Sequence, residues 1–337
     1  MEESNVPTRV FIVPYRNRYH QKFFFSRQMD FLLEYYKNYI ILFVHQSDDR
    51  NFNRGAMKNI GFIAIKEKYP DDYKNITFIF NDVDTLPFTR IFDYDTVDGV
   101  VKHYYGFEEA LGGIVVIKGG DFEKINGYPN FWGWGMEDAC LQKRCNRHKI
   151  DIDRSNFYPI GSPEILQLFD GVSRLISKKD NTRMITDNGR DGIRSIHKLN
   201  YTIDKESSNP EDNVHIISNN NINYVNVSRF QTLVRFNNEE FFEYDLREPK
   251  QNIVYSQDAE ITEKRVVTTD EWKNIPYIPT VEERNAENIR LQAQAYIARQ
   301  RQLQSSSGIY SQQYARLIGA RPRASASAKI GLGGIKF

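Results

Sequence analysis

The sequence predicts an α/β protein built on a mixed, mainly parallel sheet that is flanked by helices. Short apolar runs at 10–13, 40–44 and 76–80 are typical of strands that are buried on both faces. The longer stretches 21–36 and 53–68, which lie between these runs, have the spacing of helices. This alternating β-α-β-α-β order favours a parallel sheet with helices on both faces.

Further elements are expected after residue 100, with less regular spacing. A strand at 113–118 leads into a short helix near 121–125, and another helix should open at about Met136. Strand character returns at 222–227 and 232–236. The polar stretch 154–220, which lies between the helix that opens at about Met136 and these strands, has poor periodicity. A stretch of that length suggests a functional loop or lid.

The overall composition excludes several classes of partner. The 337 residues are 40% hydrophobic, which is enough for a substantial core. Their 45 basic and 44 acidic side chains give a net charge of +1, so no global field favours nucleic acid. No apolar run approaches the roughly 18 residues of a membrane span, and the N-terminus lacks the pattern of a secretory signal. We therefore expect a cytoplasmic protein of microbial or viral origin.

The C-terminal part of the chain differs in composition from the rest. From residue 284 onward it becomes rich in Gln, Ala, Ser and Arg, and the stretch 288–337 has eight basic and no acidic residues. Such low-complexity sequence is expected to be disordered or partly helical. The predicted organisation is a catalytic domain at 1–283 followed by a basic tail at 284–337.

Two carboxylates follow the third predicted strand directly. Asp82 and Asp84 lie where that strand ends, and ligands of parallel sheets bind at the carboxyl ends of the strands. A carboxylate pair there can hold a divalent cation, which would neutralise a phosphate leaving group. The same spacing also occurs at 93–95 and 151–153, where it more often marks a solvated turn.

A second candidate site is the sequence WGWGMED at 132–138. Its glycines allow a tight turn, and Trp132 and Trp134 offer flat faces on which a sugar can stack. Glu137 and Asp138 fall in the first turn of the following helix, where a carboxylate can act as a general base. The alternative is an aromatic corner of the core that is capped by acidic residues.

Five motifs together resemble the β-1,4-galactosyltransferase family, whose members are inverting, metal-dependent glycosyltransferases of the GT-A fold that use UDP-sugars. The resemblance covers the core 9–237, well over 9–150 and loosely over 190–235. The motifs occur in the order and spacing of that family, and they are VPYRNR (13–18), FNRG (52–55), FNDVD (80–84), LGGIVVIKGGDFEKINGYPN (111–130) and FWGWGMED (131–138).

The resemblance implies a role for individual residues. Arginines suit donor binding because their fork of N–H groups matches phosphate oxygens. Asp84 and His197 match the metal ligands, with Mn²⁺ as the expected ion, and Trp134 matches the wall between donor and acceptor sugars. Asp138 matches the catalytic base at the acceptor, with Glu137 beside it. The positions that match donor-binding residues of the family are Pro14, Arg16, Arg18, Phe52, Arg54, Asp82, Ala110 and Gly113.

Three positions depart from the family pattern. Ala139 replaces an aspartate that grips the acceptor sugar, and Ala110 replaces a tyrosine that disfavours a 2-acetamido group on the donor. His197 lacks the partner of the family's His-x-His pair, because Ser195 stands at the other site. A rival alignment offers Met184 and Asp187 as the metal ligands instead.

The expected activity is transfer of a hexose or N-acetylhexosamine from a UDP-sugar to a hydroxyl of a glycan or glycoconjugate. Two other functions remain open at this point. A non-catalytic glycan- or nucleotide-binding protein could retain the fold, since Ala139 and the missing histidine could be signs of decay. A nucleotidyltransferase would share the nucleotide-binding half but would not need the WGWGMED turn.

Overall fold

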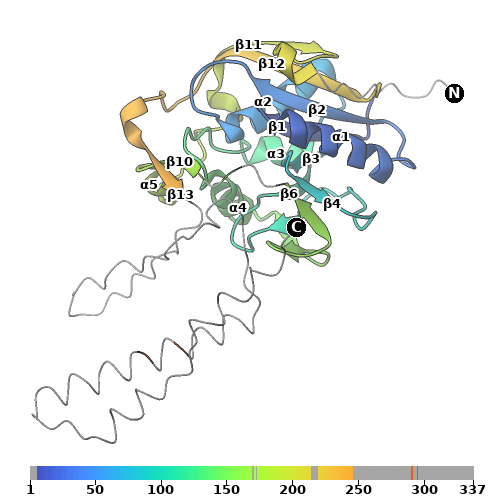
Figure 1. Cartoon of the computed structure of the whole chain (residues 1–337), viewed down its shortest axis with the longest axis horizontal. Helices are drawn as coiled ribbons and strands as arrows, with labels where there is room; N and C mark the ends of the chain where they lie inside the picture. Colours follow the sequence, from blue (N-terminus) through green and yellow to red (C-terminus); the bar gives the residue numbers. More distant parts are fainter. Residues whose placement is uncertain are drawn as a thin grey trace, which may run out of the picture. The chain divides into compact units, whose positions relative to one another are not determined.

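The computed structural model describes residues 6–168, 171, 173–213, 219–245, 290 and 294 (Figure 1). The regular elements up to residue 118 are β1 (Arg9–Tyr15), α1 (Tyr19–Leu32), β2 (Tyr39–Gln46), α2 (Arg54–Lys68), β3 (Thr77–Asn81), β4 (Thr85–Pro87), β5 (Val100–Gly106) and β6 (Ile114–Lys118). The later helices are α3 (Gly119–Lys124), α4 (Glu137–Arg147) and α5 (Asp180–Ile185), with 3₁₀ turns η1 (Ile193–Ser195), η2 (Pro210–Asn213) and η3 (Asn238–Glu240). The later strands are β7 (Asp151–Asp153), β8 (Tyr158–Pro159), β9 (Ile165–Gln167), β10 (Ser173–Ser177), β11 (His197–Asp204), β12 (Ile222–Gln231) and β13 (Phe241–Asp245).

One nine-stranded mixed sheet forms the centre of the fold. Its order is β11-β12-β2-β1-β3-β6-β5-β7, with β8 pairing to β5. The four strands β12, β2, β1 and β3 run parallel to one another, whereas β6 and β11 are antiparallel to their neighbours. Figure 1 shows β12 beside β2 and β11 outside β12, although both are far from β2 in sequence. The expected mainly parallel sheet is confirmed, and the carboxyl ends of its central strands lie at one edge.

The central strands are buried on both faces, as their apolar runs predicted. Val10 and Ile12 of β1 lie in the core cluster that includes α2, whereas Phe11 and Val13 lie in the cluster that includes α1. Fully burying a side chain of this kind contributes about 1.5–3 kcal/mol. Helix α2 approaches the sheet closely at Gly61, where a Cβ atom would come within 2.8 Å of the Ile12 side chain. These contacts fix α2 against the sheet.

The region between α4 and β12 contains more structure than its sequence suggested. Instead of a plain loop over 154–220, the chain forms short strands, α5 and the long strand β11. Strands β4 and β9 pair antiparallel, as do β10 and β13. The expected strand at 232–236 is wrong, because β12 ends at Gln231 and the Thr232 hydroxyl donates to the carbonyl of Val234 at 2.6 Å. These pairings hold the region against the rest of the domain.

The chain divides into a unit of residues 1–267, which contains all the described strands, and a unit of residues 268–337. Of the second unit, only Arg290 and Gln294 are described. The predicted boundary at residue 284 and nearly all of the basic tail at 284–337 lie outside the described residues, so both stay predictions. Among the helices that the structure describes, none combines the length and apolar character needed to cross a membrane.

Candidate active site

The predicted carboxylate pair lies at the carboxyl edge of the sheet. Strand β3 ends at Asn81, and the backbone N–H of Asp82 donates to the Gly113 carbonyl at 3.1 Å, which ties the turn to the start of β6. The Asp84 carbonyl accepts from the N–H of Leu168 at 2.7 Å. Because both ends of the turn are held by neighbouring segments, its two carboxylates are presented at a defined place.

Arg54 joins this turn to the start of helix α4. Its Nε and Nη2 atoms donate to the two carboxylate oxygens of Asp82 at 3.0 and 2.5 Å. Its Nη1 atom donates to Asp138 Oδ2 at 2.6 Å and also to Glu137 Oε1. Charge-assisted, forked contacts of this kind are the strong class of hydrogen bond. The Arg54 guanidinium therefore joins Asp82, which follows β3, to the predicted base Asp138 and its neighbour Glu137. These three residues, Asp82, Glu137 and Asp138, form the carboxylate cluster.

A buried lysine supplies a second positive charge to the carboxylate cluster. Lys58 is fully buried, and its Nζ atom lies 3.3 Å from Asp138 Oδ1 and 3.9 Å from Asp82 Oδ1. The ammonium group also lies 4.3 Å from the centre of the Tyr128 ring, a cation–π contact. Lys58 stands one helical turn after Arg54 in α2, so both cations project from the same side of that helix.

The environments of Glu137 and Asp138 push their pKa values in opposite directions. Burial, and then the charge of Asp138, raise the pKa of Glu137, and its Oε2 atom has no hydrogen-bond partner among the described residues. Burial would also raise the pKa of Asp138, but Arg54 and Lys58 outweigh it and hold that pKa below its ordinary value. The opposite shifts make Asp138 the member of the pair that ionises more readily.

The turn before α4 exposes one tryptophan and buries the other. Trp132 is buried, and its indole N–H donates to the Val234 carbonyl at 2.9 Å. Trp134 is 44% exposed, and its backbone N–H donates to the Leu175 carbonyl at 2.8 Å. Positive φ angles at Gly135 (91°) and Met136 (69°) then turn the chain sharply into α4. The exposed indole therefore lies beside the start of the helix that carries Asp138.

A cavity opens at the carboxyl ends of β1 and β2. Its volume is about 310 Å³. Charged and hydrogen-bonding groups dominate its wall, which suits a polar ligand better than an apolar one. The cavity is lined by Arg16, Asn17, His45, Gln46, Ser47, Asp48, Asp49, Ser208, Asn209 and Pro210.

Comparison with known proteins identifies the family. Residues 4–95 match the family described as the N-terminal region of glycosyl transferase group 7, and residues 98–166 match the family described as the N-terminal domain of galactosyltransferase. A xylosylprotein 4-beta-galactosyltransferase of Caenorhabditis elegans is 30% identical over 208 residues, which are 57% of this chain and 70% of that protein. The chain belongs to the β-1,4-galactosyltransferase family.

Other relatives in this family are longer than the matched part. Beta-1,4-galactosyltransferase 4 of Cricetulus griseus is 32% identical over 169 residues, which are 46% of this chain and 47% of that protein. The chain thus spans about half the length of that relative. Membership of the β-1,4-galactosyltransferase family makes sugar transfer the activity expected of this chain.

A solved structure supports the fold independently. A mutant of Drosophila beta-1,4-galactosyltransferase 7, in a complex with manganese, UDP-Gal and xylobiose, aligns with a TM-score of 0.50 at 18% identity. The alignment covers 66% of this chain and 94% of that one. The expected GT-A architecture of the β-1,4-galactosyltransferase family is therefore confirmed.

The residues predicted to bind the donor lie along the same edge of the sheet. Arg16 follows β1 directly and lines the cavity, and Pro14 is buried in β1. Arg18 precedes α1 and is half-buried, as is Phe52, which packs against the core beside α2. Arg54 is engaged by the carboxylate cluster. The structure thus gathers these residues near the strand ends, and their contacts with a donor stay predictions.

Ala110 and Gly113 lie in the same loop as Gly112, which packs against Asp138. The Ala110 carbonyl accepts from the N–H of Gly112 at 2.9 Å. A Cβ atom at Gly112 would lie 2.5 Å from Asp138 Oδ2, and one at Gly113, where φ is 67°, would lie 2.4 Å from the Tyr105 carbonyl oxygen. Both glycines are therefore required sterically, and the loop packs directly against Asp138.

The structure does not bring His197 next to Asp84. His197 is exposed at the start of β11, and its Nδ1 atom lies 3.0 Å from the Ser195 carbonyl oxygen. Strand β11 is the outermost strand, four steps from β3, and neighbouring strands are spaced by about 4.8 Å. The expected Asp84/His197 metal pair is therefore not assembled in this structure.

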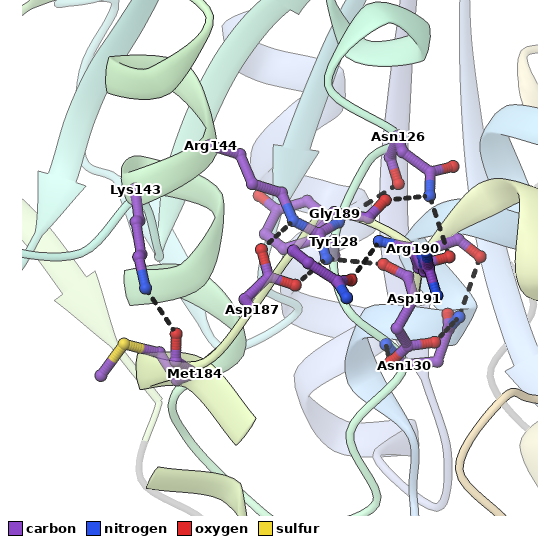
Figure 2. A network of polar contacts seen from close by, with 12 residues as sticks. Asn126, Tyr128, Asn130, Lys143, Arg144, Met184, Asp187, Gly189, Arg190 and Asp191 are labelled. Atoms are coloured by element: carbon purple, nitrogen blue, oxygen red, sulfur yellow. Dashed lines mark hydrogen bonds and ion pairs between the residues drawn. The ribbon is translucent and has the colours of Figure 1, made fainter. Parts of the chain in front are cut away.

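The alternative ligands Met184 and Asp187 are engaged elsewhere. Arg144 binds both carboxylate oxygens of Asp187, with Nε at 3.0 Å and Nη2 at 2.7 Å (Figure 2). The Met184 carbonyl accepts from Lys143 Nζ at 3.1 Å. Burial would raise the pKa of Asp187, but the pairing with Arg144 outweighs it and lowers that pKa. Asp187 therefore anchors the α5 region to α4 and is not available to a metal beside Asp84.

This anchor yields a stability prediction. The side chains of Arg144 and Asp187 are 0% and 5% exposed, so Arg144→Met should leave a buried carboxylate unpaired and lower the free energy of unfolding by about 3–5 kcal/mol. Arg147→Met is the matched control, because Arg147 is 39% exposed and its Nη1 lies 4.0 Å from the same carboxylate. Chemical denaturation of both variants measures the difference. Equal stability losses would contradict the assigned role of Arg144.

Lys58 and Gly112, which lie against the carboxylate cluster, were not singled out from the sequence. Lys58 carried a usable signal, because it follows Arg54 by four positions on a predicted helix and must share its face. Gly112 belongs to the motif at 111–130, but no separate role was expected for it. Its contact with Asp138 depends on how β6 is placed against α4, which no local pattern of the sequence reveals.

His103 contacts the loop that contains Gly112, and its burial leads to a prediction about how stability depends on pH. Its Nδ1 accepts from Arg154 Nε at 3.1 Å, and its Nε2 lies 3.0 Å from the Gly112 carbonyl oxygen, to which it donates. Burial, and then the charge of Arg154, lower the pKa of His103 to about 4, compared with about 6.5 for an unfolded histidine. Between these values the unfolded chain binds a proton that the folded chain does not.

Stability should therefore fall as the pH falls from about 6.5 toward 4. At pH 5 the loss from His103 is about 2 kcal/mol relative to pH 7. His103→Gln retains an N–H donor but does not titrate, so its unfolding free energy should depend less steeply on pH. Urea titrations of both proteins at pH 7 and pH 5 give the comparison. Parallel pH profiles would exclude His103 as the source.

Proposed function

We propose that the domain transfers a hexose or N-acetylhexosamine from a UDP-sugar to a hydroxyl of a glycan or glycoconjugate, with inversion at the anomeric carbon. The observation that carries this proposal is the bridge made by Arg54 between Asp82 and Asp138. The same guanidinium contacts Asp82, which is predicted to bind the donor, and Asp138, which is predicted to act as the base at the acceptor. Membership of the β-1,4-galactosyltransferase family supports the same activity.

A divalent cation, with Mn²⁺ as the proposed ion, fits the residues at the end of β3. Asp84 is half-buried, and burial followed by the charge of Asp82 raises its pKa although the charges of Arg54 and Arg18 act in the opposite sense. Among the described residues, no group of three or more His, Cys, Asp or Glu side chains is arranged so that it could hold a metal ion by itself. Asp84 would hold the ion together with oxygens of the donor diphosphate and water, as oxygen-ligated cations are often held. When bound, the ion supplies positive charge to the departing diphosphate.

The chain's own residues supply the other components of the reaction. Asp138, which stays ionised, accepts the proton of the acceptor hydroxyl as that oxygen attacks the anomeric carbon. Arg54 and Lys58 fix the orientation of this carboxylate from α2. Trp134 offers an exposed aromatic face beside it, on which a sugar can stack. Ala110 leaves more room near the donor than a tyrosine would, so an N-acetylhexosamine is included among the donors.

Nucleotide binding is proposed for the cavity of about 310 Å³ beside β1 and β2. Arg16 lines it, and polar groups suited to a ribose or a base surround it. The cavity lies at the same sheet edge as Asp82 and Asp84, so a nucleotide there could direct its phosphates toward the carboxylate pair. This arrangement follows the general rule for ligands of parallel sheets.

A panel of UDP-sugars tests the proposal directly. The protein is incubated with each donor and Mn²⁺, with and without a mixture of mono- and disaccharide acceptors, and free UDP is measured together with the glycosylated product. Release of UDP that rises on addition of an acceptor supports transfer. Binding of UDP without any turnover would instead favour a non-catalytic binding protein, and release of pyrophosphate would favour a nucleotidyltransferase.

A further inference from the structure

The loop that connects β2 to α2 forms part of the wall of the cavity of about 310 Å³. Asp48 of this loop lines the cavity, and its Oδ1 atom accepts from Gln46 Nε2 at 2.9 Å and from the backbone N–H of Arg50 at 3.0 Å. Arg16, which also lines the cavity, donates from Nη1 to the carbonyl of Arg50. The backbone of Arg50 therefore holds two charged residues of the cavity wall, although Arg50 does not itself line the cavity.

The side chain of Arg50 neutralises Asp48. Its Nε and Nη2 atoms donate to Asp48 Oδ2 at 3.2 and 2.5 Å, and the two side chains are 28% and 17% exposed. Without this partner, Asp48 would add a negative charge to the wall of a cavity for which nucleotide binding is proposed. Like charges repel more strongly in a partly buried site than in bulk water. The ion pair therefore makes the cavity more favourable for an anionic ligand.

The same guanidinium lies against the aromatic turn before α4. Its Cζ atom lies 4.5 Å from the centre of the Trp132 ring and 4.4 Å from the centre of the Phe230 ring, and Nη2 also donates to the Phe230 carbonyl at 3.1 Å. A planar guanidinium is attracted to aromatic faces and stacks on them. Trp132 stands two residues before Trp134, so Arg50 restrains the turn that presents the exposed indole.

We infer that Arg50 is a positioning residue that joins the nucleotide cavity to the turn that carries Trp134. It neutralises Asp48 in the wall of the cavity and holds Trp132 by its ring, so the donor wall and the sugar wall keep one arrangement. A side chain in contact with both parts limits their relative movement, as preorganised sites require. The inference rests on the proposed use of a UDP-sugar, and it adds a residue that belongs to none of the five sequence motifs.

Calorimetry with UDP and with uridine, both in the presence of Mn²⁺, tests the role of Arg50 at the cavity. We expect Arg50→Met to weaken UDP binding about 10-fold, because the uncompensated charge of Asp48 repels the diphosphate, and to weaken binding of the neutral uridine less than about threefold. Adding Asp48→Asn to Arg50→Met removes that charge and should recover most of the lost UDP affinity. Equal losses for UDP and uridine, or no loss for either, would overturn the inference.

Arg9→Met is the matched control for Arg50→Met. Arg9 also donates to a carboxylate, Asp95 at 3.3 Å, and to a carbonyl, that of Tyr94 at 3.1 Å. Its guanidinium lies 4.9 Å from the centre of the Tyr36 ring. Because Arg9 stands at the start of β1, whereas the cavity lies where β1 ends, Arg9→Met should bind UDP as the wild type does. Arg50→Lys keeps a charge beside Asp48 and should bind UDP more tightly than Arg50→Met.

Hydrogen exchange of the turn 131–136 tests the contact with Trp132 without any substrate. The Trp134 N–H donates to the Leu175 carbonyl, so its exchange with solvent reports opening of the turn. We expect faster exchange in Arg50→Met than in the wild type, and no change in Arg9→Met. If the wild type fails to bind UDP but this difference is found, the proposed donor is wrong and the positioning role of Arg50 stands. If UDP binds and exchange of the turn is the same in Arg50→Met and the wild type, the proposed function stands and the role of Arg50 in joining the two parts is refuted.

Discussion

Asp138→Asn is expected to lower kcat for sugar transfer by at least about 100-fold while the protein still binds UDP. A positioned general base contributes about 10²–10⁴-fold, and asparagine keeps the shape of the side chain without its ability to accept the proton. Asp138 is the suitable carboxylate because Arg54 and Lys58 keep it ionised. Steady-state transfer kinetics at saturating donor and acceptor, with calorimetry for UDP, provide the measurement.

Two controls make the result on Asp138 specific. Asp151→Asn is the same substitution at an exposed position in β7 and should leave kcat unchanged. Thermal unfolding of Asp138→Asn checks that α4 remains in place, since the variant leaves Arg54 with Asp82 and Glu137 as partners. A variant that folds normally and retains kcat within about threefold would remove Asp138 from the role of base.

Removal of divalent ions is expected to lower transfer at least about 100-fold and to weaken UDP binding. The reason is that an ion on Asp84 supplies several kcal/mol of charge stabilisation to the departing diphosphate, and each 1.36 kcal/mol is worth a factor of ten. Dialysis against a chelator, followed by addition of Mn²⁺, Mg²⁺ or Ca²⁺ in turn, measures both the loss and its restoration. Oxygen ligands suit all three ions, and we expect Mn²⁺ to restore the most activity.

In the presence of Mn²⁺, Asp84→Asn should lower sugar transfer and UDP binding as much as removal of divalent ions does in the wild type. The control is Asp95→Asn, because Asp95 also belongs to an Asp-x-Asp sequence but is paired with Arg9 and lies away from the cluster. His197→Ala tests the ligand that the family resemblance implied, and in this structure we expect little loss. Full activity without divalent ions would contradict the assignment of Asp84.

The parts of the fold that the sequence predicted are those with local signals. Strands β1 to β3 and helices α1 and α2 follow from apolar runs and helical spacing, because burial on both faces leaves a continuous pattern. The short pairs β4–β9 and β10–β13 left no such pattern. Each joins segments that are far apart in sequence, so only the folded chain reveals them.

The site shows the same division between local and non-local information. Asp82, Asp138 and Arg54 were predicted from motifs, yet their direct contact was not, since Asp82 follows β3 while the other two lie on α4 and α2. His197 was predicted as a ligand from its position in the sequence, whereas its strand lies at an edge of the sheet, so its role stays a prediction.

The position of Arg54 has a consequence for the order of events in a catalytic cycle. Before any substrate arrives, its guanidinium is shared by three carboxylates, although its motif is one that implies contact with the donor nucleotide. An incoming diphosphate would compete for that guanidinium and so alter the charge felt by Asp138. On the proposed function, we expect that a donor which draws Arg54 away from Asp138 would raise the pKa of this carboxylate and so make it a stronger base.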